Sequence, residues 1–565
     1  MNPAELYDRH RPLLDRAAQA CRERDCWSPW PDMPAGYPDS ANAQARARSA
    51  FDAQRGKAFD IEGHPGAAGE PSVEASPYTQ QTLDIRYPQS DPDTLFAAAE
   101  AAMMTWAGIG TETRLGVLME VVDRLYRGYL FDVATAMMHT AGQSANMAYA
   151  GSGVNALDRA IEALVYAREA LQAVTRSGRW ERPFGSARIT LDKTWRATPR
   201  GVAGCFTCAT FATRNARPSM MASLATGNAV IVKPHPTSVL PMAISVRVFR
   251  EVLAEAGFDP NLVTMLTDTA TEPVGKVLVK HPKAAIIDFT GSARFGQWVE
   301  QHAHPALAFT ETSGVNTVVI ESADDLDATL RSLATTMCMF SAQMCTSPQN
   351  VYLPRTGVRT PQGVVPMDEV AQRLAAAIDA VGSDPRRAGM ILAAIQSPST
   401  LALMQQLREE GARVGQLLLE PRPYPHPEFP QARTCTPLLI QTDPSHRTLY
   451  GEERFGPIGF VIACADGADA LHQATTDVRE FGGLTAFLYS TDEAFIGRAE
   501  DAYARAGAQL TINLTGPMPL NFAAAYSDVH VTGLNPAGNA SLTDASFIAG
   551  RFRITQSRRP AARRA

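Results

Sequence analysis

A cysteine and a glutamate are the side chains of this sequence best suited to covalent chemistry. Cys345 lies in SAQMCTSPQN, among small and polar residues, whereas Cys338 lies in TTMCMF, among the apolar neighbours typical of a structural thiol. A thiol becomes a nucleophile when its surroundings favour the thiolate. Glu311, in FTETSG, is a carboxylate beside an apolar run and could act as a base toward water. Taken alone, Cys345 also fits a structural residue, and Glu311 an exposed loop charge.

A second group of residues could bind a nucleotide. The stretch DFTGSARFG predicts the end of a strand, then Gly291 and Ser292, then a helix that begins near Ala293. The free backbone N–H groups at a helix start suit a phosphate, and Gly291 has no side chain to obstruct its approach. Lys233 ends the apolar run of NAVIVKP and could reach ribose hydroxyls or a phosphate. Gly-Ser turns and lysines at strand ends are common without a ligand, so neither identifies a site alone.

The elements that would position these residues follow from the hydrophobic pattern. Residues 4–24 and 93–173 carry apolar side chains at helical spacing. From about Ala203, short runs such as NAVIVKP and AAIIDFT alternate with helix-like stretches, which is typical of βαβ units and a parallel sheet. A nucleotide would bind at the carboxyl ends of such strands. The later runs TVVIES, GFVIACA and LTAFLYS predict a second α/β domain.

We therefore expect an α/β protein of several domains, because 565 residues exceed the usual size of one domain. The expected units are an N-terminal helical extension (1–62), a nucleotide-binding domain (63–310), a catalytic domain (311–515) and a C-terminal segment with a basic tail (516–565). The tail RFRITQSRRPAARRA is expected to be solvated and partly disordered.

Composition narrows the classes of function. The 52 basic and 58 acidic residues give a net charge of −6, which does not point to nucleic acid or a membrane surface. Eight cysteines are too few in this length for a disulfide framework, and no apolar run is long enough to span a membrane. We expect a soluble, cytoplasmic protein. The single CxxC pair, Cys205 and Cys208, is interpreted as small buried residues rather than a metal site, and no metal is expected.

Together these motifs resemble the aldehyde dehydrogenase superfamily, in the same order along the chain. LATGNAVIVKP is similar to the family's cofactor strand with its lysine, here Lys233. FTGSARFG is similar to the family's glycine motif and supplies Gly291, Ser292 and Gly296. EERFGPIGFV resembles a later motif in which Glu453 and Phe455 would hold the nicotinamide ribose and ring.

The two reactive residues also fit this resemblance. ETSGVN and SAQMCTSPQN stand where the family has its glutamate and its cysteine, and their separation (345 − 311 = 34) equals the family's usual spacing. The resemblance implies a Rossmann-type cofactor domain, a catalytic domain and oxidation of a small-molecule aldehyde. Cys345 would attack the aldehyde carbon, and the resulting thioester would be hydrolysed by water that Glu311 activates.

Two positions depart from the family pattern. The family's oxyanion-hole asparagine corresponds to Thr210 (233 − 23 = 210), whose hydroxyl can donate one hydrogen bond but is shorter than an amide. The hole would then use the Cys345 backbone N–H with Thr210 or a nearby group such as Asn215. Pro236 stands where a ribose-binding glutamate is frequent, so that nothing obvious repels a 2′-phosphate. NADP is therefore expected at least as much as NAD.

The N-terminal stretch LYDRHRPLLDRAAQACRERDCWSPWPDMP and the chain length are similar to one branch, the phenylacetic acid degradation proteins. This similarity implies a substrate from aerobic aromatic-ring breakdown, such as an acyl-CoA semialdehyde. Residues 179–200 fall where the family has an arm that pairs subunits, which implies a homodimer or homotetramer. Two alternatives remain open: a CoA-acylating dehydrogenase, which generally lacks the glutamate, and a noncatalytic scaffold of the same fold.

Overall fold

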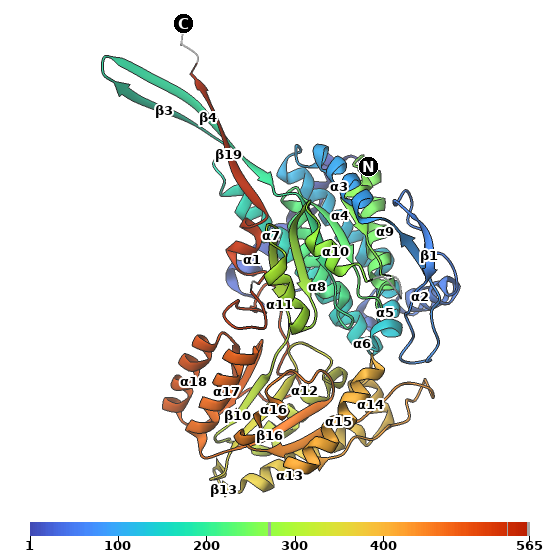
Figure 1. Ribbon diagram of the computed structural model, residues 1–565, viewed down its shortest axis with the longest axis vertical. Coiled ribbons are helices and arrows are strands. Elements are labelled where there is room, and N and C mark those ends of the chain that lie inside the picture. Colours follow the sequence, from blue (N-terminus) through green and yellow to red (C-terminus); the bar gives the residue numbers. More distant parts are fainter. Residues whose placement is uncertain (269–272, 540, 562–565) are drawn as a thin grey trace.

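The computed structural model describes residues 1–268, 273–539 and 541–561. Figure 1 shows two lobes and a thin arm that projects from the upper lobe. The helices, in chain order, are α1 (Pro3–Glu23), α2 (Ser40–Gln54), α3 (Pro92–Trp106), α4 (Thr111–Arg124), α5 (Leu130–Ala141), α6 (Ala145–Met147), α7 (Ala156–Gln172), α8 (Ala212–Ala225), α9 (Leu240–Glu255), α10 (Gly275–Lys280), α11 (Ala293–His302), α12 (Leu326–Cys338), α13 (Met367–Gly382), α14 (Pro385–Ile391), α15 (Pro398–Val414), α16 (Arg447–Tyr450), α17 (Gly467–Phe481), α18 (Glu493–Ala506) and α19 (Ala545–Ala549).

The strands form five sheets. They are β1 (Ala67–Pro71), β2 (Arg86–Gln89), β3 (Ser177–Phe184), β4 (Ala187–Pro199), β5 (Val202–Phe206), β6 (Ala229–Lys233), β7 (Val263–Met265), β8 (Ala284–Thr290), β9 (Leu307–Glu311), β10 (Asn316–Ile320), β11 (Pro348–Pro354), β12 (Val358–Thr360), β13 (Gly363–Val365), β14 (Gln416–Leu419), β15 (Leu438–Thr442), β16 (Ile458–Cys464), β17 (Thr485–Tyr489), β18 (Gln509–Ile512) and β19 (Phe552–Pro560).

The upper lobe contains a five-stranded parallel sheet in the order β7-β6-β5-β8-β9. Strands β5 and β6 are fully buried apolar runs, as expected for a parallel sheet covered on both faces. The chain runs from β5 to β7 on one side and then returns to β8 and β9 on the other. This reversal opens a crevice at the carboxyl ends of β5 and β8, which is where open α/β sheets bind ligands.

The first two helices belong to the core of this lobe. Leu6 and Leu14 of α1 and Phe51 of α2 lie in the same buried cluster as the apolar residues of α4, α5 and α7. Two π-helical turns, Leu125–Tyr129 and Ala148–Asn155, interrupt the helical region that the sequence predicts over residues 93–173. The N-terminal helices are therefore packed into the lobe rather than set apart from it.

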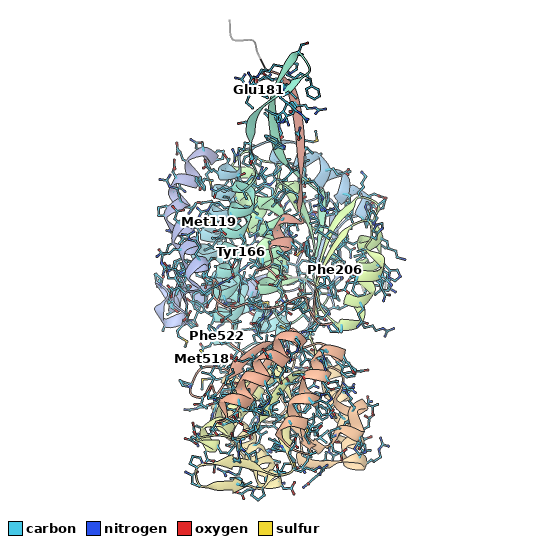
Figure 2. All side chains as sticks on the ribbon, turned by 90° about the vertical axis from the view of Figure 1, so that its left-hand side faces the viewer. Met119, Tyr166, Glu181, Phe206, Met518 and Phe522 are labelled. Atoms are coloured by element: carbon cyan, nitrogen blue, oxygen red, sulfur yellow. The ribbon has the colours of Figure 1, made fainter. Side chains whose placement is uncertain are left out.

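The lower lobe contains a seven-stranded sheet in the order β14-β15-β16-β11-β10-β17-β18. Its pairings are parallel except between β14 and β15. The apolar runs TVVIES, GFVIACA and LTAFLYS become β10, β16 and β17, so this set of predicted strands is confirmed. Figure 2 shows Met518 and Phe522 at the level where the two lobes meet.

The arm is a three-stranded antiparallel sheet of β3, β4 and β19. The prediction of a partly disordered tail is wrong for Phe552–Pro560, because this segment pairs with β4 along its whole length, from Phe552 opposite Pro199 to Pro560 opposite Leu191. Its three arginines, Arg553, Arg558 and Arg559, are exposed and still pair with residues of β4, so a high charge does not prevent strand formation at the surface. The last four residues of the tail, 562–565, lie outside the described residues. None of the described helices is both long and apolar enough to cross a membrane.

Candidate active site

Cys345 lies in the loop that leads into β11 of the lower lobe. The side-chain amide of Asn316, at the start of β10, donates hydrogen bonds to the carbonyl oxygens of Cys345 and Ser347, each at 2.8 Å. The amide oxygen of Asn316 accepts hydrogen bonds from the backbone N–H groups of Leu484 (2.9 Å) and Thr485 (3.0 Å). Asn316 thus ties the cysteine loop to two neighbouring strands. Asn316 belongs to the motif ETSGVN, from which no role for this residue was predicted.

Glu311 is the last residue of β9 in the upper lobe. Its Oε1 accepts a hydrogen bond of 2.9 Å from the side-chain amide of Asn215 on α8. The C-terminal segment crosses this strand end, because the Thr312 backbone N–H donates to the carbonyl of Ala537 at 2.7 Å. Glu311 and Cys345, which come from different lobes, therefore lie at one junction.

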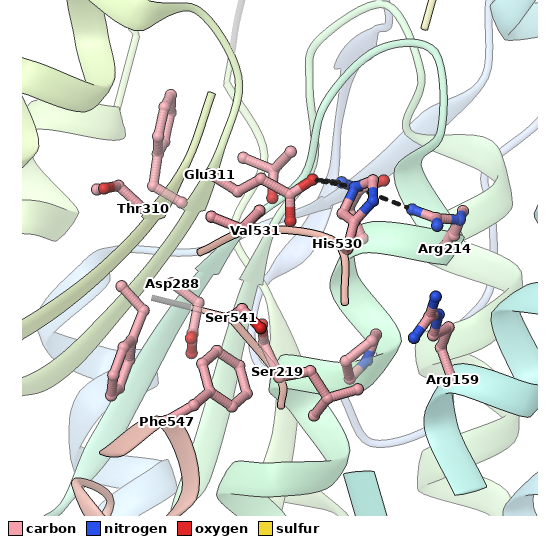
Figure 3. A pocket seen from close by; sticks show the side chains of 16 residues that line it. Arg159, Arg214, Ser219, Asp288, Thr310, Glu311, His530, Val531, Ser541 and Phe547 are labelled. Carbon is pink, nitrogen blue, oxygen red and sulfur yellow. Dashed lines mark hydrogen bonds and ion pairs between the residues drawn. The ribbon is translucent and has the colours of Figure 1, made fainter. Parts of the chain in front are cut away.

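His530, from the C-terminal segment, lies between these two residues. Its Nε2 is 3.0 Å from Glu311 Oε1 and 3.7 Å from Cys345 Sγ. The guanidinium of Arg214 approaches the same ring nitrogen at 3.4 Å, and Figure 3 shows Glu311, His530 and Arg214 in a row. The side chains of His530 and Glu311 are 14% and 22% exposed. The sequence did not predict a role for His530. Its one signal there is that it is the last histidine of the chain and lies in a segment that departs from the family pattern.

Burial and charge set the protonation states at this junction. Burial raises the pKa of the Cys345 thiol, and the nearby carboxylate of Glu311 raises it further. Burial lowers the pKa of His530, although the contact with Glu311 opposes this effect. Burial also acts to raise the pKa of Glu311, but the charge and hydrogen bond of His530, with the charge of Arg214, outweigh it and lower the pKa. At neutral pH the site thus holds a thiol, an imidazole and a carboxylate.

Two cavities meet at these residues. The large cavity, of about 640 Å³, is lined by Cys345 and mostly by apolar side chains. These include Trp27, Trp30, Met147, Phe211, Met344 and Phe522. The small cavity, of about 70 Å³, is lined by Glu311 and by Asp288 and Thr310 of the upper lobe. Arg214, Asn215 and His530 line both cavities and form the wall between them.

Thr210 is not among the residues that line either cavity. It is buried in the loop between β5 and α8, and its carbonyl accepts a hydrogen bond of 2.7 Å from the Gln143 side chain. Asn215, the alternative donor for an oxyanion, lines the large cavity together with Cys345. The structure therefore brings Asn215 to the thiol side of the site, and a role for Thr210 remains a prediction.

Four of the predicted cofactor residues lie at or just beyond the carboxyl ends of strands of the five-stranded sheet: Lys233 ends β6, and Gly291, Ser292 and Gly296 follow β8. Ser292 precedes the first residue of α11 and makes no capping hydrogen bond through its side chain. Its hydroxyl and the first N–H groups of α11 suit a phosphate. A Cβ at Gly296 would lie 2.5 Å from the Thr312 side chain, so this glycine allows α11 to pack closely beside Glu311. These residues fit a nicotinamide dinucleotide.

Lys233, at the end of β6, forms an ion pair with Asp268, and both side chains are largely buried. The other carboxylate oxygen of Asp268 accepts a hydrogen bond of 2.7 Å from the Val274 backbone N–H. A carboxylate therefore lies beside Lys233, although position 236 holds a proline where the family frequently has a glutamate. Asp268 follows β7, the strand beside β6. Because Asp268 is far from Lys233 in the sequence, no local motif indicated that the two side chains would pair.

Glu453 and Phe455 line a crevice of the lower lobe together with Gly314, Asn316 and Met344. The hydroxyl of Ser313 donates a hydrogen bond to Glu453. Burial raises the pKa of Glu453 to about 7, although the Ser313 hydrogen bond opposes this shift. The motif that carries Glu453 thus lies next to both Asn316 and the loop that leads to Cys345.

Comparison with known proteins identifies the family. The sequence profile of the aldehyde dehydrogenase family matches residues 70–519, which is well over half of the chain. The chain belongs to the aldehyde dehydrogenase family. The predictions of an aldehyde dehydrogenase and of its α/β fold are thereby confirmed.

Relatives of this aldehyde dehydrogenase include proteins of different names. A crystal structure described as an NAD-dependent aldehyde dehydrogenase from Burkholderia multivorans is 43% identical, with a TM-score of 0.94 over 99% of each chain. The 1-pyrroline-5-carboxylate dehydrogenase 2 of Halalkalibacterium halodurans is 24% identical over 75% of this chain and 78% of its own length. A 1-pyrroline-5-carboxylate dehydrogenase from Thermus with bound NAD is 18% identical, with a TM-score of 0.72 over 93% of this chain and 97% of its own, and shares the fold. These relatives lend no support to the resemblance to the phenylacetic acid branch.

Proposed function

We propose that this aldehyde dehydrogenase oxidises an apolar aldehyde to a carboxylic acid, with Cys345 as the nucleophile and Glu311 as the final proton acceptor. The observation that carries the proposal is the meeting of Cys345 and Glu311 beside a large apolar cavity, although they come from different lobes. A volume of about 640 Å³ lies within the usual range for pockets that bind small molecules.

The chain's own residues account for the order of steps. Cys345 attacks the aldehyde carbon, and its backbone N–H and the Asn215 amide are the donors that we assign to the oxyanion. NAD(P) would be held by Lys233, Ser292, the start of α11, Glu453 and Phe455, and would supply the hydride acceptor. The thioester on Cys345 is then hydrolysed by water. Because Glu311 has a lowered pKa, it is ionised at neutral pH and can take the proton.

We also propose that NAD is preferred over NADP. The carboxylate of Asp268, paired with Lys233, would accept hydrogen bonds from ribose hydroxyls and repel a 2′-phosphate. The Burkholderia multivorans relative is described as NAD-dependent, which agrees with this preference.

For the substrate we propose an aldehyde from aromatic-ring breakdown, such as a ring-opened semialdehyde. The N-terminal stretch that resembles the phenylacetic acid degradation proteins supplies Trp27, Trp30 and Met33 to the wall of the large cavity. The lining of the large cavity includes the carboxyl groups of Asp32 and Asp158 and the guanidinium of Arg214, an arrangement that does not suit the phosphates of CoA. If the substrate carries CoA, only its acyl part would enter the cavity.

The arm is proposed to pair subunits into a homodimer or homotetramer. It extends away from the upper lobe, with Glu181 labelled near its tip in Figure 2. Its apolar residues Phe184 (52%) and Ile554 (58%) are exposed in the single chain. Exposed apolar side chains on a projecting sheet favour contact with a second copy.

The test uses the purified full-length chain with NAD, with and without free CoA, while the absorbance of reduced nicotinamide is followed. The substrates are phenylacetaldehyde, a long-chain alkanal, propanal and a ring-opened acyl-CoA semialdehyde. We expect turnover without CoA, faster with the larger apolar aldehydes, and its loss in Cys345→Ala. Strict dependence on free CoA would instead indicate the acylating reaction, and lack of turnover with all four would indicate a scaffold.

A further inference from the structure

We propose that His530 is the catalytic base that takes the proton of Cys345 and passes it to Glu311. The proposal rests on the position of one ring nitrogen, Nε2, which is 3.7 Å from the thiol and 3.0 Å from the carboxylate. The Sγ atom of Cys345, a carboxylate oxygen of Glu311 and a ring nitrogen of His530 all lie within 4.8 Å of one another. A base within reach of a nucleophile and oriented by a third group is the general pattern of an activated nucleophile.

The two cavities explain why a carrier is needed. Cys345 lines the large cavity and Glu311 the small one. A proton released on the thiol side can reach the carboxylate through the wall between them. His530 is the titratable residue in that wall, since the other two residues that line both cavities are Asn215 and Arg214. The raised pKa of the buried thiol makes a neighbouring base necessary at neutral pH.

The transfers balance in both halves of the reaction. In the resting site Nε2–H donates to Glu311. As sulfur bonds to the aldehyde carbon, this proton passes to the carboxylate, the S–H bond of Cys345 breaks, and a new N–H bond forms at Nε2. An O–H bond has then formed on Glu311 and the ring is again neutral, after which Glu311 releases its proton to solvent. In hydrolysis, water adds to the thioester carbon, one of its protons passes through Nε2 to Glu311, and the C–S bond breaks. The departing thiolate of Cys345 then recovers a proton from Glu311 along the same path. Both halves rest on the function proposed above, whereas the role of His530 as a base toward the thiol is tested below without aldehyde or cofactor.

The pKa of His530 depends on the charged groups that surround its ring. Glu311 favours the protonated ring, whereas Arg214 and Arg159 disfavour it, and burial does so most strongly. Arg159 is itself paired with Glu162 at 2.7 Å, which reduces its effect on the ring. Glu453 and Cys208 face the thiol side of the site. The ring is therefore neutral in the resting enzyme and can accept a proton.

Alkylation of Cys345 by iodoacetamide tests this role without aldehyde or cofactor. Its rate is measured against pH by mass spectrometry of the Cys345 peptide, with the exposed Cys26 as a reference in the same sample. For the unmodified protein we expect a plateau through neutral pH. In His530→Gln, the rate at pH 7.5 should fall by about 10²-fold and recover only as the thiol itself ionises. The matched control is His446→Gln, at a partly exposed histidine of the lower lobe.

A second variant separates proton transfer from a structural effect. His530→Ala removes the ring from the wall of the large cavity, and added imidazole should restore alkylation at neutral pH. Identical pH profiles for His530→Gln and the unmodified protein would overturn the proposal. The proposal would also be overturned if alkylation of the unmodified protein began only above pH 9, as the thiol itself ionises. This measurement needs no variant. If the unmodified protein shows the plateau but turns over no aldehyde, the proposed function is contradicted and the role of His530 as a base is not.

Discussion

Asn316 and Cys345 are joined by a hydrogen bond of 2.8 Å from the asparagine amide to the cysteine carbonyl oxygen. The substitution Asn316→Asp keeps the size of the side chain and its acceptor atoms but removes this donor. We expect the free energy of unfolding to fall by about 1–3 kcal/mol. The turnover number should fall by about 10²-fold because the thiol is displaced. Urea unfolding and steady-state kinetics measure the two effects, and unchanged turnover would show that other contacts hold the loop.

Asp268 is expected to set the choice of cofactor. The substitution Asp268→Ser removes the carboxylate beside Lys233, and the repulsion of a 2′-phosphate is lost with that carboxylate. We expect the ratio of the NADP and NAD dissociation constants to move by about tenfold toward NADP. Calorimetric titration of the protein with each dinucleotide measures this ratio without turnover. Asp259→Ser is the control, since this exposed aspartate caps Pro260–Leu262 and serine can replace it as a cap.

Glu453 predicts a pH dependence of cofactor binding. Its pKa is raised to about 7, so the side chain is neutral below this pH and an ionised acceptor above it. Because ribose hydroxyls donate more strongly to a carboxylate, NAD should bind up to about tenfold more tightly at pH 8 than at pH 6. The Glu453→Gln variant should lose this dependence. An equal dependence in both proteins would place the titrating group elsewhere.

The arm predicts a defined assembly. Ile554 lies on β19 opposite Ala197 and is 58% exposed in the single chain. If subunits pair through the arm, Ile554→Asp places a charge in that contact, and sedimentation should show a shift to smaller species. Val364→Asp, at a residue of β13 that is 59% exposed, is the matched control and should leave the assembly unchanged. The proposal fails if both variants sediment like the unmodified protein.

The parts of the fold that the sequence could predict are those with a local signal. Apolar runs predicted β6, β8 and β10, and the spacing of Glu311 and Cys345 indicated their joint use. His530 and Asp268 had no such signal, because each reaches the site from a loop whose position depends on contacts far along the chain. Phe552–Pro560 was predicted wrongly for a related reason. Its arginines indicate solvent exposure, and only its partner strand β4 makes it a strand.

The central claim is that aldehyde oxidation passes through a thioester on Cys345 that Glu311 helps to hydrolyse. The most direct measurement uses Glu311→Gln with an apolar aldehyde and NAD, combined with rapid acid quench and mass spectrometry of the Cys345 peptide. We predict one burst of reduced cofactor, equal in amount to the enzyme sites, followed by a stall and an acyl group on that peptide. Steady turnover at the unmodified rate, with no acyl group on Cys345, would contradict the account.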